Sequence, residues 1–263
     1  MKFRAATAAV AAVPLALGLA ACGNDKPEAT GSKASVPAGV PVAGNTVAPQ
    51  QAAPVAHLNR VSFVPAMTTA IAKQKSWRIT GTMTANGATL LTMDGIQTAK
   101  PVAMSMTMAG AAFQGKTAKF VVVKDTGYVS IPGMTPTGKY LKFKSGANSE
   151  LSELLDGGDP TKIFKSFNSN VVSVKFVRTE TVGGEKLDRY GVSVNTAKAL
   201  AAQGKKVPAG VPKTLTYSMW MDKSHLVRRM SFDLGGVSMV MNMTDYNKAV
   251  HITAPPASKV ISR

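Results

Sequence analysis

Apolar and polar residues alternate with a period of two over most of the chain after residue 76, and this pattern constrains the fold more than any other feature. Trp77, Ile79 and Met83 alternate with polar residues, and the dipeptide Asn86-Gly87 follows them. Alternation is typical of a strand with one buried face, and Asn-Gly favours a two-residue hairpin turn. The stretch therefore predicts a β-hairpin, with a return strand over residues 91–95.

The same alternation predicts further antiparallel strands over 104–108, 119–124, 127–131, 139–143, 171–181, 187–194, 214–222, 225–234 and 237–247. An apolar stripe with helical spacing predicts a helix over 58–76, beginning near Ser62 as its cap. Shorter helices are predicted over 149–155, over 159–167 and after Asn195. The dipeptide Pro255-Pro256 is expected to end the sheet, because proline has no amide donor for another strand. An antiparallel sheet with helices on one face is an α+β domain.

The first 22 residues have the pattern of a bacterial lipoprotein signal peptide. Lys2 and Arg4 precede an apolar run that ends at Leu19, and the small residues before Cys22 resemble a lipobox. We expect cleavage between Ala21 and Cys22, followed by acylation of the Cys22 thiol. The alternative is an ordinary secretory signal in which this cysteine occurs by chance. Either reading predicts export, and the first predicts a lipid anchor on the extracytoplasmic face of the cell membrane, within the cell envelope.

These features divide the chain into four predicted parts. A signal peptide over 1–21 precedes a disordered, Pro/Ala/Thr-rich tether over 22–57, a folded domain over 58–257 and a C-terminal tail over 258–263. Cys22 is the only cysteine, so an intrachain disulfide is impossible. Once Cys22 is acylated, thiol catalysis and cysteine-ligated metal sites are excluded as well.

The formal net charge is +17, and a charge of this size in a protein that stays inside the cell would suggest nucleic acid as the binding partner. The predicted export argues against that partner, and the basic residues are scattered along the chain. The polyanions available to an exported protein are phospholipid headgroups and cell-wall polymers. The charge therefore predicts either a membrane-facing or wall-facing surface, or simply a well-solvated exterior. We expect a monomer.

Methionine is unusually frequent in the predicted strands. Ten methionines occupy alternating strand positions and should share one face: Met83, Met104, Met106, Met108, Met219, Met221, Met230, Met239, Met241 and Met243. Methionine is flexible and polarizable, so such a face would suit an adaptable apolar binding surface. The alternatives are a plain core that uses methionine as filler, or soft copper(I) ligands, although strand alternation explains the spacing without a metal.

Enzymatic motifs are absent from the sequence. The histidines are His57, His225 and His251, and none lies in a nucleophile, metalloprotease or phosphate-loop motif. We therefore predict no enzymatic activity, no cofactor and no metal site.

Several stretches resemble the LppX/LprG group of actinobacterial lipoproteins, within the wider LolA-like fold. They are the lipobox with its long tether, 76–81 (SWRITG), 190–195 (YGVSVN), 219–222 (MWMD) with 226–229 (LVRR), and 244–250 (TDYNKAV) followed by 254–256 (APP). The resemblance implies a strongly curved antiparallel β-sheet, or half-barrel, with helices covering its concave face. It also implies that the space between sheet and helices binds lipid or another apolar molecule, and it brings no catalytic residues.

Two functions follow as expectations. The first is a membrane-anchored carrier of an apolar ligand, with the two helices after residue 148 as a lid. The lid residues would be Leu151, Leu154, Ile163, Phe164 and Phe167. The second is a closed interaction module that binds an anionic cell-wall polymer or a partner protein through its basic surface.

Overall fold

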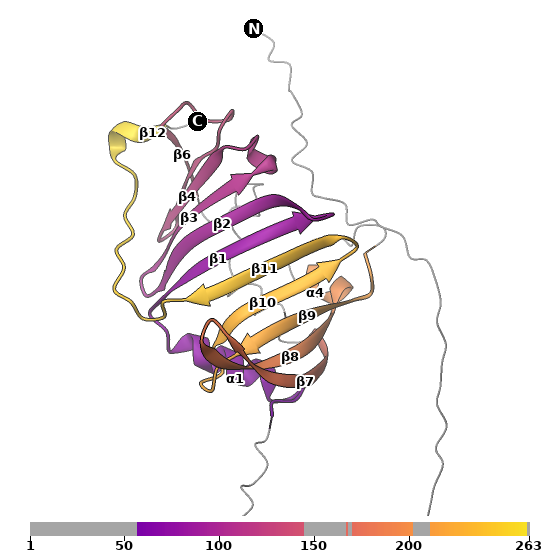
Figure 1. Ribbon diagram of the computed structural model, residues 1–263. Coiled ribbons are helices and arrows are strands. Elements are labelled where there is room, and N and C mark those ends of the chain that lie inside the picture. The colour runs from indigo at the N-terminus through magenta and orange to yellow at the C-terminus, as the bar shows by residue number, and fades with distance from the viewer. Residues whose placement is uncertain (1–56, 145–166, 168–169, 202–210, 262–263) are drawn as a thin grey trace, which may run out of the picture. The chain divides into compact units, whose positions relative to one another are not determined.

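The computed structural model describes residues 57–144, 167, 170–201 and 211–261, and these form one large sheet with a few helices (Figure 1). The strand order is β12-β6-β5-β4-β3-β2-β1-β11-β10-β9-β8-β7, so β12 and β7 are the two edges and the sheet is not closed. The strands are β1 (Ser76–Ala85), β2 (Ala88–Ala99), β3 (Val102–Gly110), β4 (Thr117–Val123), β5 (Thr126–Ser130), β6 (Tyr140–Lys144), β7 (Val171–Val182), β8 (Glu185–Asn195), β9 (Thr214–Met221), β10 (Val227–Leu234), β11 (Val237–Thr244) and β12 (Val260–Ile261).

Every strand predicted from the alternation is present, and most are longer than predicted. The turns explain why the hairpins close where they do. Asn86 and Gly87 both have positive φ angles, 49° and 80°, as a type I′ turn requires. Gly235 and Gly236 repeat this at the β10–β11 turn, with φ angles of 58° and 82°.

Helix α1 (Phe63–Ala72) begins where the sequence predicts, but the Ser62 hydroxyl does not cap it. The side-chain oxygen of Asn59 instead accepts hydrogen bonds from the Val61 and Ser62 amides, at 2.9 and 3.2 Å. The Ser62 hydroxyl oxygen is occupied by the Asn59 amide at 3.0 Å, which is why it is unavailable as a cap.

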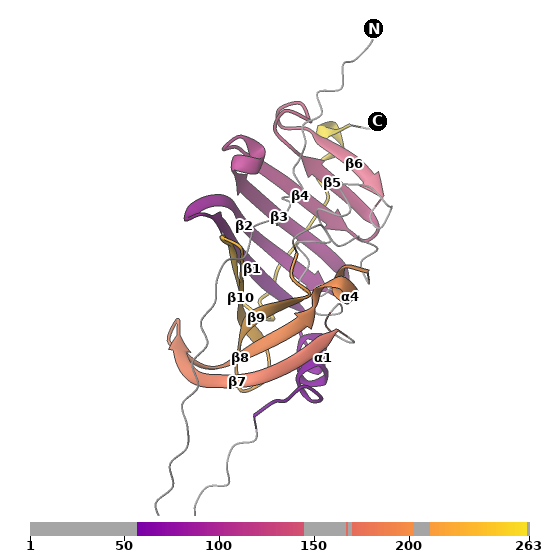
Figure 2. The same cartoon turned by 90° about the vertical axis from the view of Figure 1, so that its right-hand side faces the viewer.

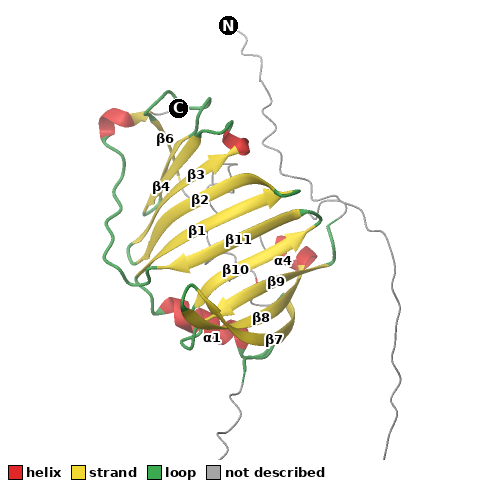
Figure 3. Ribbon diagram, in the orientation of Figure 1, coloured by secondary structure: helices red, strands yellow, loops and turns green. Residues whose placement is uncertain are grey.

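The other described helices are short, as Figure 3 shows in red: η1 (Ala111–Phe113), α4 (Thr196–Ala201) and η2 (Ala257–Lys259). Asn195 caps α4 as predicted, by accepting a hydrogen bond from the Lys198 amide at 2.9 Å. The predicted helices over 149–155 and 159–167 lie outside the described residues, except for Phe167. Among the described helices, none has the length and apolar character needed to cross a bilayer.

The C-terminal segment corrects the expectation that the sheet ends before the two prolines. After Pro256 and η2, Val260 and Ile261 form β12, which pairs in parallel with Tyr140 and Leu141 of β6. The prolines lie in the connection that leads to this strand, so their missing amides do not interrupt the pairing. The sheet is therefore antiparallel throughout except for this last, two-residue pair.

The core lies on one face of the curved sheet. Side chains from β1 to β11 form one buried cluster with Phe63, Val64 and Met67 of α1. Helix α1 lies against the β7–β10 part of the sheet in both views (Figures 1 and 2). The face that carries this cluster is called the inner face below, and the opposite face the outer face.

Candidate functional site

A row of methionines crosses the middle of the inner face. Directly paired residues form a line through seven neighbouring strands: Met108 (β3), Met93 (β2), Gly81 (β1), Met241 (β11), Met230 (β10), Met219 (β9) and Tyr190 (β8). Directly opposed residues of antiparallel strands project from the same face. Five thioether side chains therefore lie next to one another, and we call these five residues the methionine row.

The strand registers place all ten predicted methionines on this inner face. Nine are buried, with exposed fractions of 8% or less, and Met83 packs against the cluster as a half-buried side chain. Met219, Met241 and Met243 are fully buried, at 0%. The inner face is therefore closed to solvent over its centre.

Two members of this cluster, Met93 and Met67, were absent from the predicted set of methionines. Met93 shares one face of the predicted return strand with Leu91 and Gly95 and alternates with Thr92 and Asp94, a pattern that could have identified its face. Met67 lies on α1 and is 1% exposed, so the helix adds a thioether to the same core.

Two glycines make room for this packing. A Cβ atom at Gly81 would lie 2.8 Å from Cγ and 3.0 Å from Sδ of Met93. A Cβ atom at Gly95 would lie 3.1 Å from Cβ of Met106 and 2.9 Å from the Ser105 carbonyl oxygen. The methionine side chains thus lie across backbone that carries no side chain, which explains why β1 and β2 contain glycine at inner-face positions.

Aromatic rings cover the inner face near β8 to β10. The Phe167 ring lies 5.0 Å from the Tyr217 ring, which lies 5.6 Å from that of Phe232. Phe63 of α1 makes an edge contact with Tyr190 at 5.5 Å. Burial raises the pKa of Tyr217 to about 12, because the phenolate would lose its hydration among these rings.

Phe167 is thus the one predicted lid residue that the structure describes. It is 1% exposed and lies against the inner face. Leu151, Leu154, Ile163 and Phe164 lie outside the described residues, as do Ala21 and Cys22.

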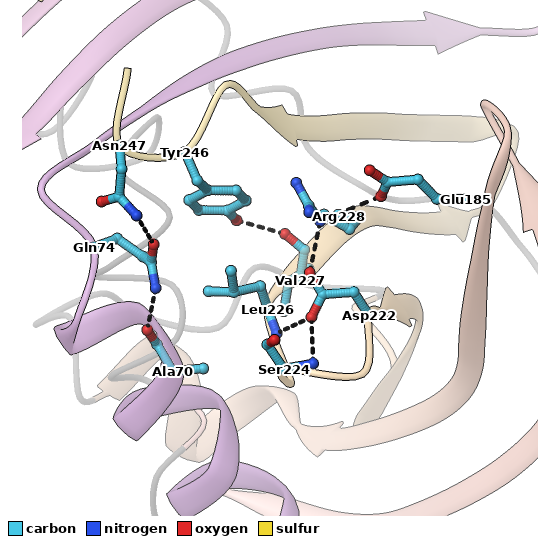
Figure 4. A network of polar contacts seen from close by, with 10 residues as sticks. All are labelled: Ala70, Gln74, Glu185, Asp222, Ser224, Leu226, Val227, Arg228, Tyr246 and Asn247. Atoms are coloured by element: carbon cyan, nitrogen blue, oxygen red, sulfur yellow. Dashed lines mark hydrogen bonds and ion pairs between the residues drawn. The ribbon is translucent and has the colours of Figure 1, made fainter. Parts of the chain in front are cut away.

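Polar contacts attach the C-terminal end of α1 to the strands, as Figure 4 shows. Gln74 donates to the Ala70 carbonyl at 2.8 Å and accepts from the Asn247 side chain at 2.7 Å. The side-chain oxygen of Asn247 accepts from the Lys75 amide at 2.7 Å. The Asn247 side chain therefore joins the segment after α1 to the chain that follows β11.

The same network continues along the end of β10. The Tyr246 hydroxyl donates to the Val227 carbonyl at 2.6 Å, and burial raises the pKa of this phenol. Asp222 accepts from the Leu226 amide at 3.0 Å and pairs with the Arg228 guanidinium at 2.8 Å. These contacts engage both carboxylate oxygens of Asp222 and hold the β9–β10 turn in place.

The outer face of β7 to β10 carries an arginine–tryptophan cluster. The guanidinium groups of Arg189 and Arg229 lie 5.0 and 5.1 Å from the Trp220 ring centre, within cation–π range. The Trp220 indole donates to the Glu180 carboxylate, which also pairs with Arg178, and these two hydrogen bonds lower the pKa of Glu180. Trp220 and Glu180 therefore contact three arginines on this face.

A small pocket opens at the β7 end of the sheet. Its volume is about 180 Å³, and its lining residues are Arg60, Asn170, Val171, Val172, Asn195 and Lys198. Pockets that enclose drug-sized ligands have volumes of about 300–1,000 Å³. This pocket suits water or a small polar group and is too small for an acyl chain, and the methionine row does not contribute to its lining.

No candidate metal site is assembled in the part of the chain that the structure describes. No three histidine, cysteine, aspartate or glutamate side chains come together there as a metal site would require. His225 lies in the β9–β10 turn with a φ angle of 62°, and His251 lies in the exposed connection after β11. The two methionine triplets of β3 and β11 are separated by β1 and β2.

No protein-family model matches the sequence, and no curated protein matches it either. Solved structures do match the fold. The lipoprotein LppX of Mycobacterium tuberculosis aligns with 74% of this chain and 98% of its own, with a TM-score of 0.52 and 16% identity. LprF of Mycobacterium bovis aligns with 74% of this chain and 96% of its own, with a TM-score of 0.53 and 13% identity. The chain therefore has the LolA-like, curved-sheet fold of these two mycobacterial proteins.

Proposed function

We propose that this chain is an exported lipoprotein, acylated at Cys22, whose domain carries an apolar ligand, and specifically a lipid, on the inner face of the sheet. The fold it shares with LppX, which is a lipoprotein, supports a place in the cell envelope. Binding and transfer would need no catalytic group.

The methionine row carries this proposal. Five adjacent thioether side chains on one face are unusual, because strands commonly place β-branched and aromatic residues there. Methionine changes rotamer readily and accepts irregular apolar shapes, so a methionine surface can repack around different acyl chains. Each methylene buried on such a surface would contribute about 0.8 kcal/mol.

A ligand must displace protein before it reaches the row. Met219 and Met241 are fully buried beneath an inner-face cluster that includes Phe63, Met67 and Phe167. We infer that loading separates these covering side chains from the sheet, and that the segment leading to Phe167 acts as the lid.

Native mass spectrometry of the mildly purified mature chain tests this function. The carrier function predicts an extra mass that organic extraction removes, and uptake of a fluorescent fatty acid by the extracted protein. A protein with no extractable ligand and no uptake would contradict it.

The complete burial of the row favours a second candidate, a closed interaction module with a dry core. Met241→Glu separates the two. In a dry core the buried carboxylate should unfold the domain. At the wall of a cavity that opens, the variant should remain folded by circular dichroism and lose fatty acid uptake. Met134→Glu is the matched control, because Met134 is 58% exposed.

Acylation has a test of its own. Cells that express the parent chain should incorporate labelled palmitate into it and retain it in the membrane fraction. Cys22→Ser should remove the label and release the protein. Retention of the label in the variant would contradict the assignment of Cys22.

A further inference from the structure

Positive charge is concentrated at the β4–β6 end of the sheet, far more than the overall composition requires. Residues 100–144 contain a single acidic residue, Asp125, and no glutamate or arginine. They contain seven lysines: Lys100, Lys116, Lys119, Lys124, Lys139, Lys142 and Lys144. None of these lysines forms an ion pair with any described acidic residue.

The other end of the sheet is different. Arg178 pairs with Glu180, and Arg228 pairs with both Asp222 and Glu185. Three acidic side chains thus pair with arginines there, whereas no ion pair between described residues involves a lysine of β4 to β6. Lys119, Lys142 and Lys144 are exposed and have no acidic partner among the described residues, which leaves them accessible to an external anion.

Strand register gathers three of these lysines on one surface. Lys119 alternates with the buried Ala118 and Phe120 of β4, and Lys142 and Lys144 flank Phe143 of β6, so all three project from the outer face and are exposed. Strands β4, β5 and β6 lie side by side (Figure 2). Neighbouring strands are about 4.8 Å apart and alternate residues about 7 Å apart, so the three ammonium groups cover a small area.

Two tyrosines belong to the same surface. Tyr128 of β5 is paired with Lys142, and Tyr140 lies two residues before Lys142 on β6. Both are half-buried and project from the outer face. We call the outward side chains of Lys119, Tyr128, Tyr140, Lys142 and Lys144 the lysine face.

We propose that the lysine face docks the domain onto an anionic phospholipid surface. Lysine is a compact, hydrated point charge that suits a diffuse layer of phosphates, where arginine would suit a bidentate site. Tyrosine prefers the boundary between headgroups and acyl chains. The proposal rests on the anchoring proposed above for its setting, because the 36 residues of the predicted tether would span about 30–40 Å and keep the domain within reach of the bilayer.

Vesicle binding tests the proposal on the mature chain, residues 22–263, with Cys22→Ser so that no acyl chain contributes. The probes are vesicles of phosphatidylcholine with and without phosphatidylglycerol, at low and high salt. The test variant combines Lys119→Gln, Lys142→Gln and Lys144→Gln. The control variant combines Lys175→Gln, Lys186→Gln and Lys223→Gln, which are exposed and remove the same charge from the opposite end of the sheet.

A lysine close to an anionic surface contributes about fivefold in affinity. We expect the test variant to bind phosphatidylglycerol vesicles at least tenfold more weakly than the parent, with the control reduced threefold or less. High salt should abolish the difference. Equal weakening by both variants would overturn the proposal, since it would show a response to net charge alone.

Two further outcomes are informative. Binding to soluble polyphosphate, without binding to any vesicle, would overturn membrane docking and identify a soluble polyanion as the partner. Fatty acid uptake by the test variant should equal that of the parent. If uptake fails in every protein while the lysine effect persists, the carrier function is wrong and the docking face stands.

Discussion

Gly81 and Met93 occupy complementary positions at the centre of the sheet. A Cβ atom on Gly81 would lie only 2.8 Å from Cγ of Met93, so the Met93 side chain fills the space beside this glycine. A glycine in a strand interior normally weakens the strand, because it has no side chain to pack. Here the neighbouring methionine supplies the missing packing, so a strand glycine and a flexible side chain work as one unit.

Gly81→Ala should lower the free energy of unfolding by about 1–2 kcal/mol in urea denaturation, because the new methyl group displaces Met93. In a Met93→Ala background the same change should cost less than about 0.5 kcal/mol, since the obstructing side chain is gone. Gly191→Ala is the matched control: its Cβ would meet only Val177, at 4.0 Å. Equal costs in both backgrounds would contradict this account.

Tyr217 gives the domain a specific response to alkaline pH. Its pKa in the folded state is about 12, against an ordinary value of 10. The unfolded chain therefore releases this proton first, and stability is lost as pH rises from about 10 to 12. Tyr217→Phe should flatten the loss of unfolding free energy over this range, as measured by urea denaturation at several pH values. Tyr128→Phe, on the outer face, serves as control, and an equal effect there would refute the assignment.

Helix α1 depends on a polar attachment as well as on its apolar stripe. Phe63, Val64 and Met67 bury one side of the helix against the sheet. At its other end, the Asn247 side chain bonds both the Lys75 amide and Gln74. Asn247 also has a φ of 62°, in the left-handed region that asparagine tolerates better than most residues.

Asn247→Gly should cost about 1–2 kcal/mol in unfolding free energy, because two hydrogen bonds are lost while the backbone remains unstrained. Asn247→Ala should cost about 1 kcal/mol more, since alanine disfavours positive φ. Asn86→Gly is the control, at a φ of 49° in the β1–β2 turn, and should change stability by only a few tenths of a kcal/mol. Equal costs for the glycine and alanine variants would show that backbone strain is unimportant here.

The methionine row combines burial with a flexible lining. A rigid, dry core and an adaptable carrier surface make the same contacts in the closed state. They differ in how ligand binding responds to a substitution that conserves side-chain volume and removes side-chain flexibility. Leucine has nearly the volume of methionine and fewer rotatable bonds, so methionine-to-leucine substitutions distinguish a rigid core from an adaptable carrier surface.

A triple variant with Met219→Leu, Met230→Leu and Met241→Leu should remain folded, with each change costing less than about 1.5 kcal/mol. Its range of bound fatty acid chain lengths should be narrower than that of the parent in native mass spectrometry of mixed ligands. Met134→Leu, in an exposed position, should leave the range unchanged. An unchanged range in the triple variant would indicate that the row is core filler.

Local pattern alone predicted a large part of this protein. Period-two alternation located the strands from β1 to β11, and it placed the methionines of each strand on one face of that strand, because side-chain direction along a strand depends only on local backbone geometry. Asn86-Gly87 and Gly235-Gly236 predicted their turns for the same reason. The cap at Ser62 was wrong because the Ser62 hydroxyl oxygen accepts a hydrogen bond from the Asn59 amide and none from an amide of the first helical turn.

Tertiary structure decided how those elements meet. Pairing of β1 with β11 joins residues about 160 positions apart, and β12 returns to β6 beyond two prolines. These pairings set the methionines of separate strands side by side, bring Met93 over Gly81, and collect the unpaired lysines of β4 and β6 on one surface. Such contacts depend on which distant strands lie next to each other, and alternation within one strand carries no information about its neighbour.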